Sequence, residues 1–502
     1  MDVVLKSLAL ITDPYTLGVM LLAAIFGLFV GAIPGLTATM ATALLIPFTF
    51  FMDPVPAIAA IVTTVATAIF AGDIPGALLR IPGTPASAAY CDESYAMTKK
   101  GLGERALGIA LVTSVIGGLT GSIVLSMSAP VLAEFAIQFS SYEYFWLACL
   151  GLSCAVIIST GSTLKGFVSL FIGLFIATIG IDGTAGHPRF TFGSVELMGG
   201  VSFIPAMIGM FAISEVLRYV ASTRTAIEVP QQPVGSVFRG LGAILYKYKV
   251  NILRGSSIGA VVGILPGAGA DIAAWICYAI SKKRSKEPEK FGTGHPEGLV
   301  DSGAANNASL AGAWVPAIVF GIPGDSITAI VIGVLYMKGM NPGPMVFIER
   351  PELIYAVFIA FFIANLALLP LGFGAIRLSR QILKIPRRVL MPVILMFCMV
   401  GAFAINNTVF GITVMLVLGV VAYLMEENGF PVAPAILGIV LGNMIEDNFM
   451  ASMIKADGDP LGFFSRPIAA TLGIVTIILW LVPLLMMLFR RVSSSSSKKQ
   501  KL

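Results

Sequence analysis

Charged and metal-binding residues are scarce in this chain. Only 12% of its 502 residues are charged, whereas an ordinary soluble domain has about 25%. The two histidines, His187 and His295, stand in Gly-His-Pro sequences, and the five cysteines show no metal-ligand spacing, so no zinc or haem site is expected. The net charge of +5 comes from short basic loops, so no nucleic-acid partner is indicated.

Signatures of enzymes are also missing. The chain has no phosphate-binding glycine loop, no paired carboxylates and no His/Cys arrangement at short spacing. An enzyme is therefore not expected, and a cofactor is not expected either.

Hydrophobic residues, in contrast, make up 57% of the chain. They form about ten runs near the length of about 20 residues that a bilayer requires, such as 106–129, 201–220, 353–376 and 468–488. The first run follows "MDVVLKSLALITDPYT" without a cleavable signal. We therefore expect an all-α polytopic membrane protein with about 10–12 transmembrane segments.

Lysine and arginine gather in a few loops, which predicts the orientation of the spans. The loop Arg377–Arg388 and the tail from Arg490 are the clearest basic segments, so both, with the C-terminus, are expected in the cytoplasm. The stretch 134–143 has no basic residue and is expected on the opposite side.

Pro-Gly pairs interrupt the apolar runs four times, in two related sets. Pro34 corresponds to Pro266 at an offset of 232 residues, and Pro82 corresponds to Pro323 at an offset of 241. The chain therefore divides into a first membrane repeat (1–220), a cytoplasmic linker (221–253), a second membrane repeat (254–489) and a basic Ser/Lys tail (490–502). Run 106–129 follows a basic loop whereas its counterpart 353–376 precedes one, so the repeats are expected to be inverted.

A doubled break in membrane helices has a chemical use. Pro removes a backbone donor and Gly permits the turn, so each Pro-Gly pair starts or ends a helix at membrane depth. Free N–H groups at a helix N-terminus attract an anion, and released carbonyls can bind a cation, as in secondary transporters. The alternative is that the breaks are structural kinks.

Polar residues surround the breaks and give two sets of candidates. The expected substrate-binding residues are Pro34, Gly35, Thr37, Thr39, Thr84, Ser87, Pro266, Gly267, Gly269 and Gly324. A sodium site is expected near Asp271, Asn306, Asn307, Asp325 and Ser326, because hard cations prefer such oxygens. Asp73 and Arg80, seven residues apart, either serve function, pair with each other or reach the interface.

Several segments together resemble the large permease subunit of the tripartite tricarboxylate transporters, the TctA family. They are "GAIPGL", "RIPGTPASAA", "GILPGAGADIAAW", "FGTGHPEGL", "AANNASLAGAWVPAIVFGIPGDSITA" and "NPGPMVF", and the resemblance covers nearly the whole chain. It implies a bacterial inner-membrane permease that works with a small four-helix membrane subunit and a periplasmic solute-binding protein. Arg80 departs from the family pattern, which usually has Asn there, and "DSG" replaces an acidic residue before "AANNA", which leaves Asp301 as the nearest acid.

The expected function is thus secondary active uptake of small carboxylates, coupled to Na⁺ or H⁺. The alternatives are a membrane-embedded enzyme and an anion channel. An enzyme would change its substrate chemically, and a channel would not accumulate it.

Overall fold

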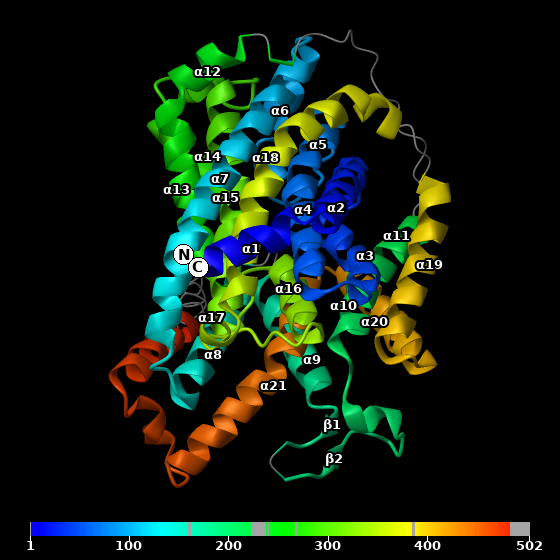
Figure 1. Ribbon diagram of the computed structural model, residues 1–502, viewed down its shortest axis with the longest axis vertical. Coiled ribbons are helices and arrows are strands. Elements are labelled where there is room, and N and C mark those ends of the chain that lie inside the picture. The colour runs from blue at the N-terminus through cyan, green and yellow to red at the C-terminus, as the bar shows by residue number, and fades with distance from the viewer. Residues whose placement is uncertain are drawn as a thin grey trace, which may run out of the picture.

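The computed structural model describes residues 2–158, 162–183, 185–221, 237–238, 240–266, 269–383 and 387–481. In this part of the chain nearly all regular structure is helical, and two short strands, β1 (Gly180–Ile181) and β2 (Pro188–Arg189), pair antiparallel (Figure 1). The α-helices before residue 222 are α1 (Asp2–Thr12), α2 (Pro14–Ala32), α3 (Ala38–Phe50), α4 (Pro54–Ala71), α5 (Asp73–Leu79), α6 (Cys91–Lys99), α7 (Gly103–Ala136), α8 (Ser141–Ile158), α9 (Thr163–Ala177), α10 (Phe203–Ile208) and α11 (Ser214–Ala221).

The later α-helices are α12 (Leu241–Lys247), α13 (Lys249–Ile264), α14 (Gly269–Arg284), α15 (Pro296–Phe320), α16 (Ser326–Met337), α17 (Val346–Glu349), α18 (Pro351–Ile382), α19 (Arg387–Asn406), α20 (Val409–Glu427) and α21 (Val432–Lys455). Short 3-10 turns are η1 (Ser87–Ala89), η2 (Glu196–Gly199), η4 (Pro288–Lys290) and η5 (Pro460–Phe464), and η3 (Gly209–Ile213) is a π-helical turn between α10 and α11.

Among the described residues, seven helices are long and apolar enough to cross a membrane, and six shorter apolar helices accompany them. The long ones are Pro14–Ala32, Pro54–Leu79, Gly103–Ala136, Phe203–Ala221, Pro351–Ser379, Arg388–Ile405 and Val409–Glu427. The expectation of an all-α polytopic membrane fold is confirmed. Residues 222–236 of the expected linker and the whole tail 490–502 lie outside the described residues, and α13 already begins at Lys249.

Small residues set the packing at the centre. In α4 every residue from Val55 to Ala71 is buried, and in α15 every residue from Gly298 to Val319 is buried. Glycine lets the neighbouring helices approach their backbones: a Cβ on Gly31 of α2 would lie 2.5 Å from the Ala68 carbonyl oxygen. A Cβ on Gly263 of α13 would lie 2.3 Å from the Ser309 carbonyl oxygen.

These two contacts occupy corresponding positions. Gly31 and Gly263 are separated by the same 232 residues as Pro34 and Pro266, and Ala68 and Ser309 by the same 241 as Pro82 and Pro323. Thus α2 packs on α4 as α13 packs on α15.

Helices from the part of the chain before residue 222 pack against helices from the part after residue 240. Helix α15 packs along α7, and α4 packs along α18, so each central helix is covered by a helix from the other part. Where α4 meets α15, Asn307 Nδ2 donates to the Ala66 carbonyl at 3.4 Å, across a separation of 241 residues. Where α7 meets α18, a Cβ on Gly118 would clash with Asn365 Oδ1.

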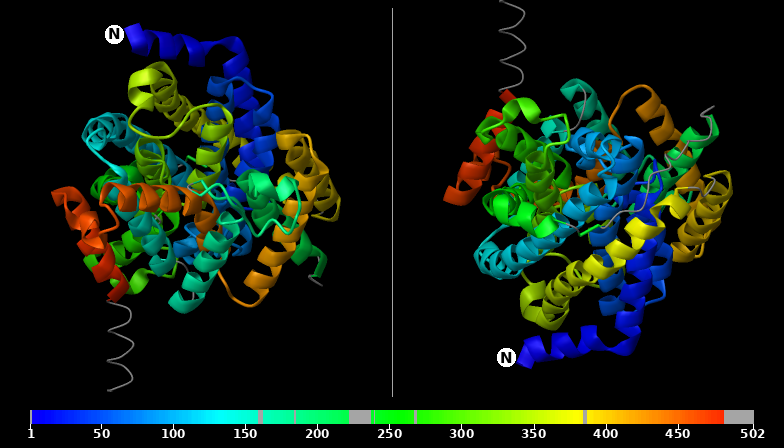
Figure 2. Two further views of the ribbon diagram at one scale, coloured as in Figure 1. Left: turned by 90° about the horizontal axis from the view of Figure 1, so that it is seen from below. Right: turned by 90° about the horizontal axis from the view of Figure 1, so that it is seen from above.

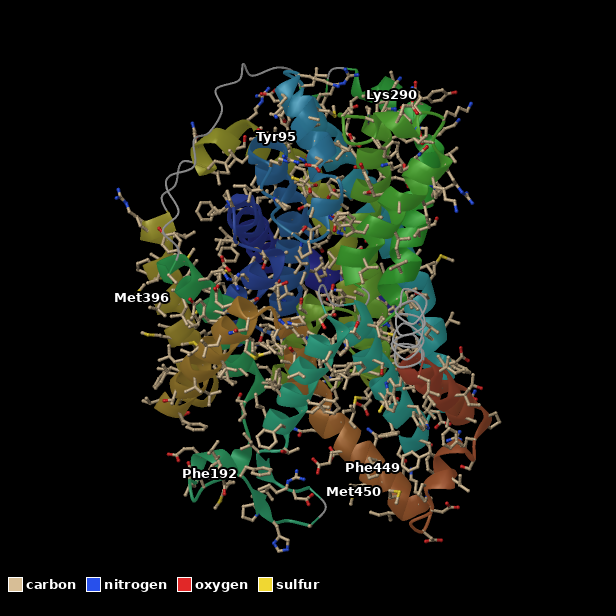
Figure 3. All side chains as sticks on the ribbon, turned by 180° about the vertical axis from the view of Figure 1, so that it is seen from behind. Tyr95, Phe192, Lys290, Met396, Phe449 and Met450 are labelled. Atoms are coloured by element: carbon tan, nitrogen blue, oxygen red, sulfur yellow. The ribbon has the colours of Figure 1, made fainter. Side chains whose placement is uncertain are left out.

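The molecule has two distinct ends and one peripheral helix. Lys290 and Tyr95 lie at one end and Phe192 at the other (Figure 3). The end with Lys290 includes α6, α12 and the basic last turn of α14, Lys282–Arg284. Helix α1 lies at the edge of the bundle (Figure 2), where Ser7 Oγ donates to the Glu352 carbonyl at 2.8 Å.

Candidate functional site: the broken helices

The first break separates α2 from α3. Helix α2 ends at Ala32, Ile33 is extended, and Gly35 has a φ of 86°, which favours glycine. Thr37 caps α3, because its Oγ1 accepts a hydrogen bond from the Met40 N–H at 3.2 Å. Pro34 is buried, and Gly35, Thr37 and Thr39 are half-buried.

The second break separates α13 from α14. Leu265 is extended after α13, Pro266 is half-buried, and Gly267 lies outside the described residues. Gly269 begins α14 with a φ of 56°, and a Cβ there would lie only 2.7 Å from Asp325 Cβ. Asp271 belongs to the first turn of α14, but its side chain lies outside the described part of the structure.

The third and fourth breaks share one backbone geometry. Helix α5 ends at Leu79 and α15 ends at Phe320, and the C-cap residues that follow, Arg80 and Gly321, are left-handed, with φ of 58° and 68°. The next residue in each case bonds back to a proline carbonyl: Ile81 N–H to Pro75 at 3.3 Å, and Ile322 N–H to Pro316 at 3.2 Å.

After each of these turns the chain folds back along its own helix. A Cβ on Gly83 would lie 2.5 Å from Gly72 Cα, and a Cβ on Gly324 would lie 2.8 Å from Ala313 Cβ. Glycine is therefore required at both positions, since any side chain would push the returning segment away from the helix. The chain re-enters the bundle at both breaks.

Both returning segments then close the same pair of hydrogen bonds. Thr84 N–H donates to Ser87 Oγ at 3.1 Å, and Ser87 N–H donates to Thr84 Oγ1 at 3.0 Å. Asp325 N–H donates to Thr328 Oγ1, and Thr328 N–H donates to Asp325 Oδ1, both at 2.8 Å. These reciprocal caps satisfy backbone donors at the start of η1 and of α16, where Ser326 is the first helical residue.

The breaks contact other parts of the bundle. Trp275 of α14 donates its Nε1–H to the Pro85 carbonyl at 3.2 Å, which ties the second break to the third. A Cβ on Gly151 of α8 would lie 2.9 Å from Ile322 and 3.3 Å from Pro266, so the second and fourth breaks share one neighbour. Helix α3, which follows the first break, packs on α16.

The two asparagines of α15 are buried beside the third break. Asn306 Nδ2 donates to Tyr90 Oη at 3.0 Å, and Tyr90 Oη donates to Asp73 Oδ1 at 2.8 Å. Asn306 and Asn307 are each 1% exposed, and the Oδ1 atoms of both have no hydrogen-bond partner. Unsatisfied buried oxygens are uncommon and call for an explanation.

The residues expected to hold sodium fall into two groups. Asp325 lies beside Gly269, and Gly324 just before it packs on Ala313, whereas Asn306 is linked to Asp73 through Tyr90. Asn306 precedes Ala313 by seven residues of continuous helix, so the groups are about 10 Å apart along α15. Asp325 also uses Oδ1 to cap α16.

Asp73 and Arg80 do not pair with each other. Arg80 Nε bonds Asp92 Oδ1 at 2.8 Å on the surface, with both side chains more than half exposed, whereas Asp73 is 3% exposed. The reason is local: α5 stops at Leu79 and the left-handed turn directs Arg80 away from Asp73.

Asp301 is buried against Arg254, which neutralises it.

Two residues that hold the segments of the candidate site together have no signal in the sequence pattern. Glu93 is fully buried and receives the backbone N–H groups of Gly294 and His295 at 2.7 and 2.8 Å, and that of Gly292. Tyr90 joins Asp73 to Asn306. Both stand in "AAYCDESYAM", where neither spacing nor composition marks them.

These features define a polytopic α-helical membrane protein with re-entrant broken helices and a buried polar centre. The model of the tripartite tricarboxylate transporter TctA family matches residues 17–437, and the chain belongs to this family. It is therefore a permease of the tripartite tricarboxylate transporter type, a system that includes partner subunits.

Two proteins of Agrobacterium vitis are similar to the chain. An uncharacterised 52.8 kDa protein in the TAR-I ttuC′ 3′ region is 33% identical over 467 residues, which cover 91% of this chain and 92% of that protein. An uncharacterised protein in the TAR-II ttuC′ 3′ region is 36% identical over 228 residues, 45% of this chain and 94% of that protein. No solved structure matches the chain.

Proposed function

We propose that the chain takes up small carboxylates of the dicarboxylate or tricarboxylate class across the bacterial inner membrane. The third and fourth breaks carry this proposal, because both return the chain into the bundle and begin a new helix there. Broken helices of this kind form the substrate and ion sites of secondary transporters. The hydroxyl groups of Thr84, and of Thr37 and Thr39 at the first break, supply donors for carboxylate oxygens, whereas the Ser87 hydroxyl donates to the Thr84 carbonyl at 2.9 Å.

We further propose that the two repeats are inverted and rock against each other around these breaks. The equivalent caps Thr84–Ser87 and Asp325–Thr328 support the repeat. The direction of the central helices supports the inversion: α5 and α6 lie above α4, whereas α16 and α17 lie below α15 (Figure 1). Transport is coupled to a cation gradient and depends on a periplasmic binding protein and a small four-helix subunit, and the C-terminus is cytoplasmic.

Reconstitution of the three proteins in liposomes tests the proposal. With a panel of labelled dicarboxylates and tricarboxylates, we expect saturable accumulation of an unchanged substrate that requires an imposed cation gradient and the binding protein. Chemical conversion of the substrate would favour a membrane enzyme, and flux that only equalises concentrations would favour an anion channel. Full-rate uptake by the chain alone would contradict the dependence on partners.

A further inference from the structure

Four acidic side chains are buried in the described part of the structure, and three of them are compensated. The four are Asp73, Glu93, Glu143 and Asp301. Glu93 receives backbone N–H groups, and Asp301 pairs with Arg254. Glu143 receives the Ser140 N–H at 2.8 Å and pairs with Arg466 at 3.2 Å. The protein thus matches buried negative charge with donors elsewhere.

Asp73 is the exception among these four. Its Oδ1 accepts only the Tyr90 hydroxyl, and its Oδ2 has no hydrogen-bond partner in the described structure. The nearby Cys91 thiol points to the Gly76 carbonyl at 3.4 Å and supplies no positive charge. An ionised carboxylate left in this state would cost several kcal/mol, so Asp73 must either take up a proton or have a cation beside it.

A neutral oxygen without a partner belongs to the side chain that shares the Tyr90 hydroxyl group with this carboxylate. Asn306 donates from Nδ2 to Tyr90, which leaves its Oδ1 unsatisfied. Asp73 Oδ2 and Asn306 Oδ1 are each bonded through one carbon to an atom that contacts Tyr90 Oη, so both lie within about 5 Å of that oxygen.

We infer that Asp73 and Asn306 hold a sodium ion, with Asp73 supplying the charge and the Asn306 amide a neutral oxygen. Protonation of Asp73 would neutralise the carboxylate but would leave the Asn306 amide oxygen without a partner, whereas a hard cation satisfies both the carboxylate and this oxygen. Tyr90 is a positioning residue, because its hydroxyl group fixes both ligands. That the ion drives uptake rests on the proposed function; its binding does not.

The position of the site links the ion to the re-entrant segment. Asp73 directly follows Gly72, against which the returning Gly83 packs, and Tyr90 directly follows η1. Asn306 belongs to α15, so the ion would fasten the third break to a central helix from the other part of the chain. Occupancy would therefore order the segment that carries Thr84 and Ser87.

Thermal unfolding of the purified chain in nanodiscs tests the site without substrate or partners. A ligand that binds only the folded state raises the melting temperature as its concentration increases. We expect NaCl, but not KCl at the same ionic strength, to raise the melting temperature of the wild type. Asp73→Asn and Asn306→Ala should abolish this sodium-specific rise. Tyr90→Phe should weaken sodium binding, so that the half-saturating sodium concentration rises about tenfold.

Asp92→Asn is the matched control, because Asp92 is exposed and pairs only at the surface with Arg80, so it should keep the full sodium response. If Asp73→Asn does not fold, Asn306→Ala gives the same test with no charge removed. Equal responses to NaCl and KCl, a sodium response that survives Asp73→Asn, or a response to pH alone would each overturn the site.

The outcome is separable from that of the proposed function. A sodium response in unfolding with no carboxylate accumulation would keep the site and reject the uptake function. Accumulation without any sodium response in unfolding would reject the site and keep the function.

Discussion

Glu93 Oε2 accepts the backbone N–H of His295 at 2.8 Å and so joins α6 to the start of α15 across 202 residues of sequence. Gly292 and Gly294 donate their N–H groups to the same carboxylate, and Tyr278 donates its hydroxyl at 2.9 Å. Because His295 is the N-cap of α15, the charge of Glu93 also lies at a helix N-terminus, which favours a carboxylate.

Glu93→Ala should release the loop 291–295 from α6. Three N–H groups would lose their acceptor, and the buried one, that of His295, would cost about 1–3 kcal/mol if it stays unsatisfied. We expect faster tryptic cleavage after Lys290, which is exposed beside this loop, and a lower melting temperature. Asp92→Ala, one residue earlier and exposed, is the control, and equal cleavage rates in both variants would contradict the role of Glu93.

Gly269→Ala should abolish uptake in a folded protein. The added methyl group would lie 2.7 Å from Asp325 Cβ, and the left-handed backbone at Gly269 disfavours any side chain by about 1 kcal/mol. The start of α14 would therefore move away from the start of α16. Gly374→Ala in α18 is the control, since nothing lies within 4 Å of its Cβ position. Normal uptake in Gly269→Ala would show that the contact is dispensable.

Arg80→Gly should stabilise the protein and leave uptake intact. Arg80 is left-handed at the end of α5, a conformation that costs an arginine about 1 kcal/mol and glycine little, and its exposed ion pair with Asp92 is worth little. Melting temperature and uptake are measured together, with Arg80→Val as the opposite case, which should be less stable. A stable Arg80→Gly variant without uptake would instead assign the arginine charge a function.

The orientation is tested with single cysteines at the two ends. In a variant without the five native cysteines, we expect Lys290→Cys to react with an impermeant reagent only after cells are permeabilised, and Phe192→Cys to react in intact cells. Lys290 lies at the basic end and the 89% exposed Phe192 at the opposite end (Figure 3). The reverse pattern would invert the membrane orientation, and labelling of both from outside would rule out a spanning arrangement between them.

The breaks were predictable because their cause is local. Pro and Gly act on the backbone at their own positions, so Pro34, Pro82 and Pro323 mark breaks that the structure contains. The offset of 241 residues also pairs Thr84 with Asp325 and Ser87 with Thr328, and these pairs form the same caps. Local chemistry repeated at a fixed offset can be read from one sequence.

The polar centre was predictable only in part. Asn306 and Asn307 stand out as adjacent amides in an apolar run, but nothing near them indicates Tyr90 or Asp73, which lie more than 200 residues earlier. The spacing of Asp73 and Arg80 suggests a pair on one helix face, and the end of α5 at Leu79 removes that possibility. Contacts between distant segments depend on packing, which no local pattern records.

The exchange of central helices constrains how the protein is made. Helices α4 and α7 leave the ribosome long before α18 and α15, the helices that cover them. During synthesis, Asp73 and Tyr90 are therefore inserted into the membrane before Asn306 has been made. Until then, lipid or a chaperone must contact the surfaces that Asn306 later covers. The fold can close only when the second half has been inserted, so a truncated or split chain would be a target for membrane proteases rather than a working half.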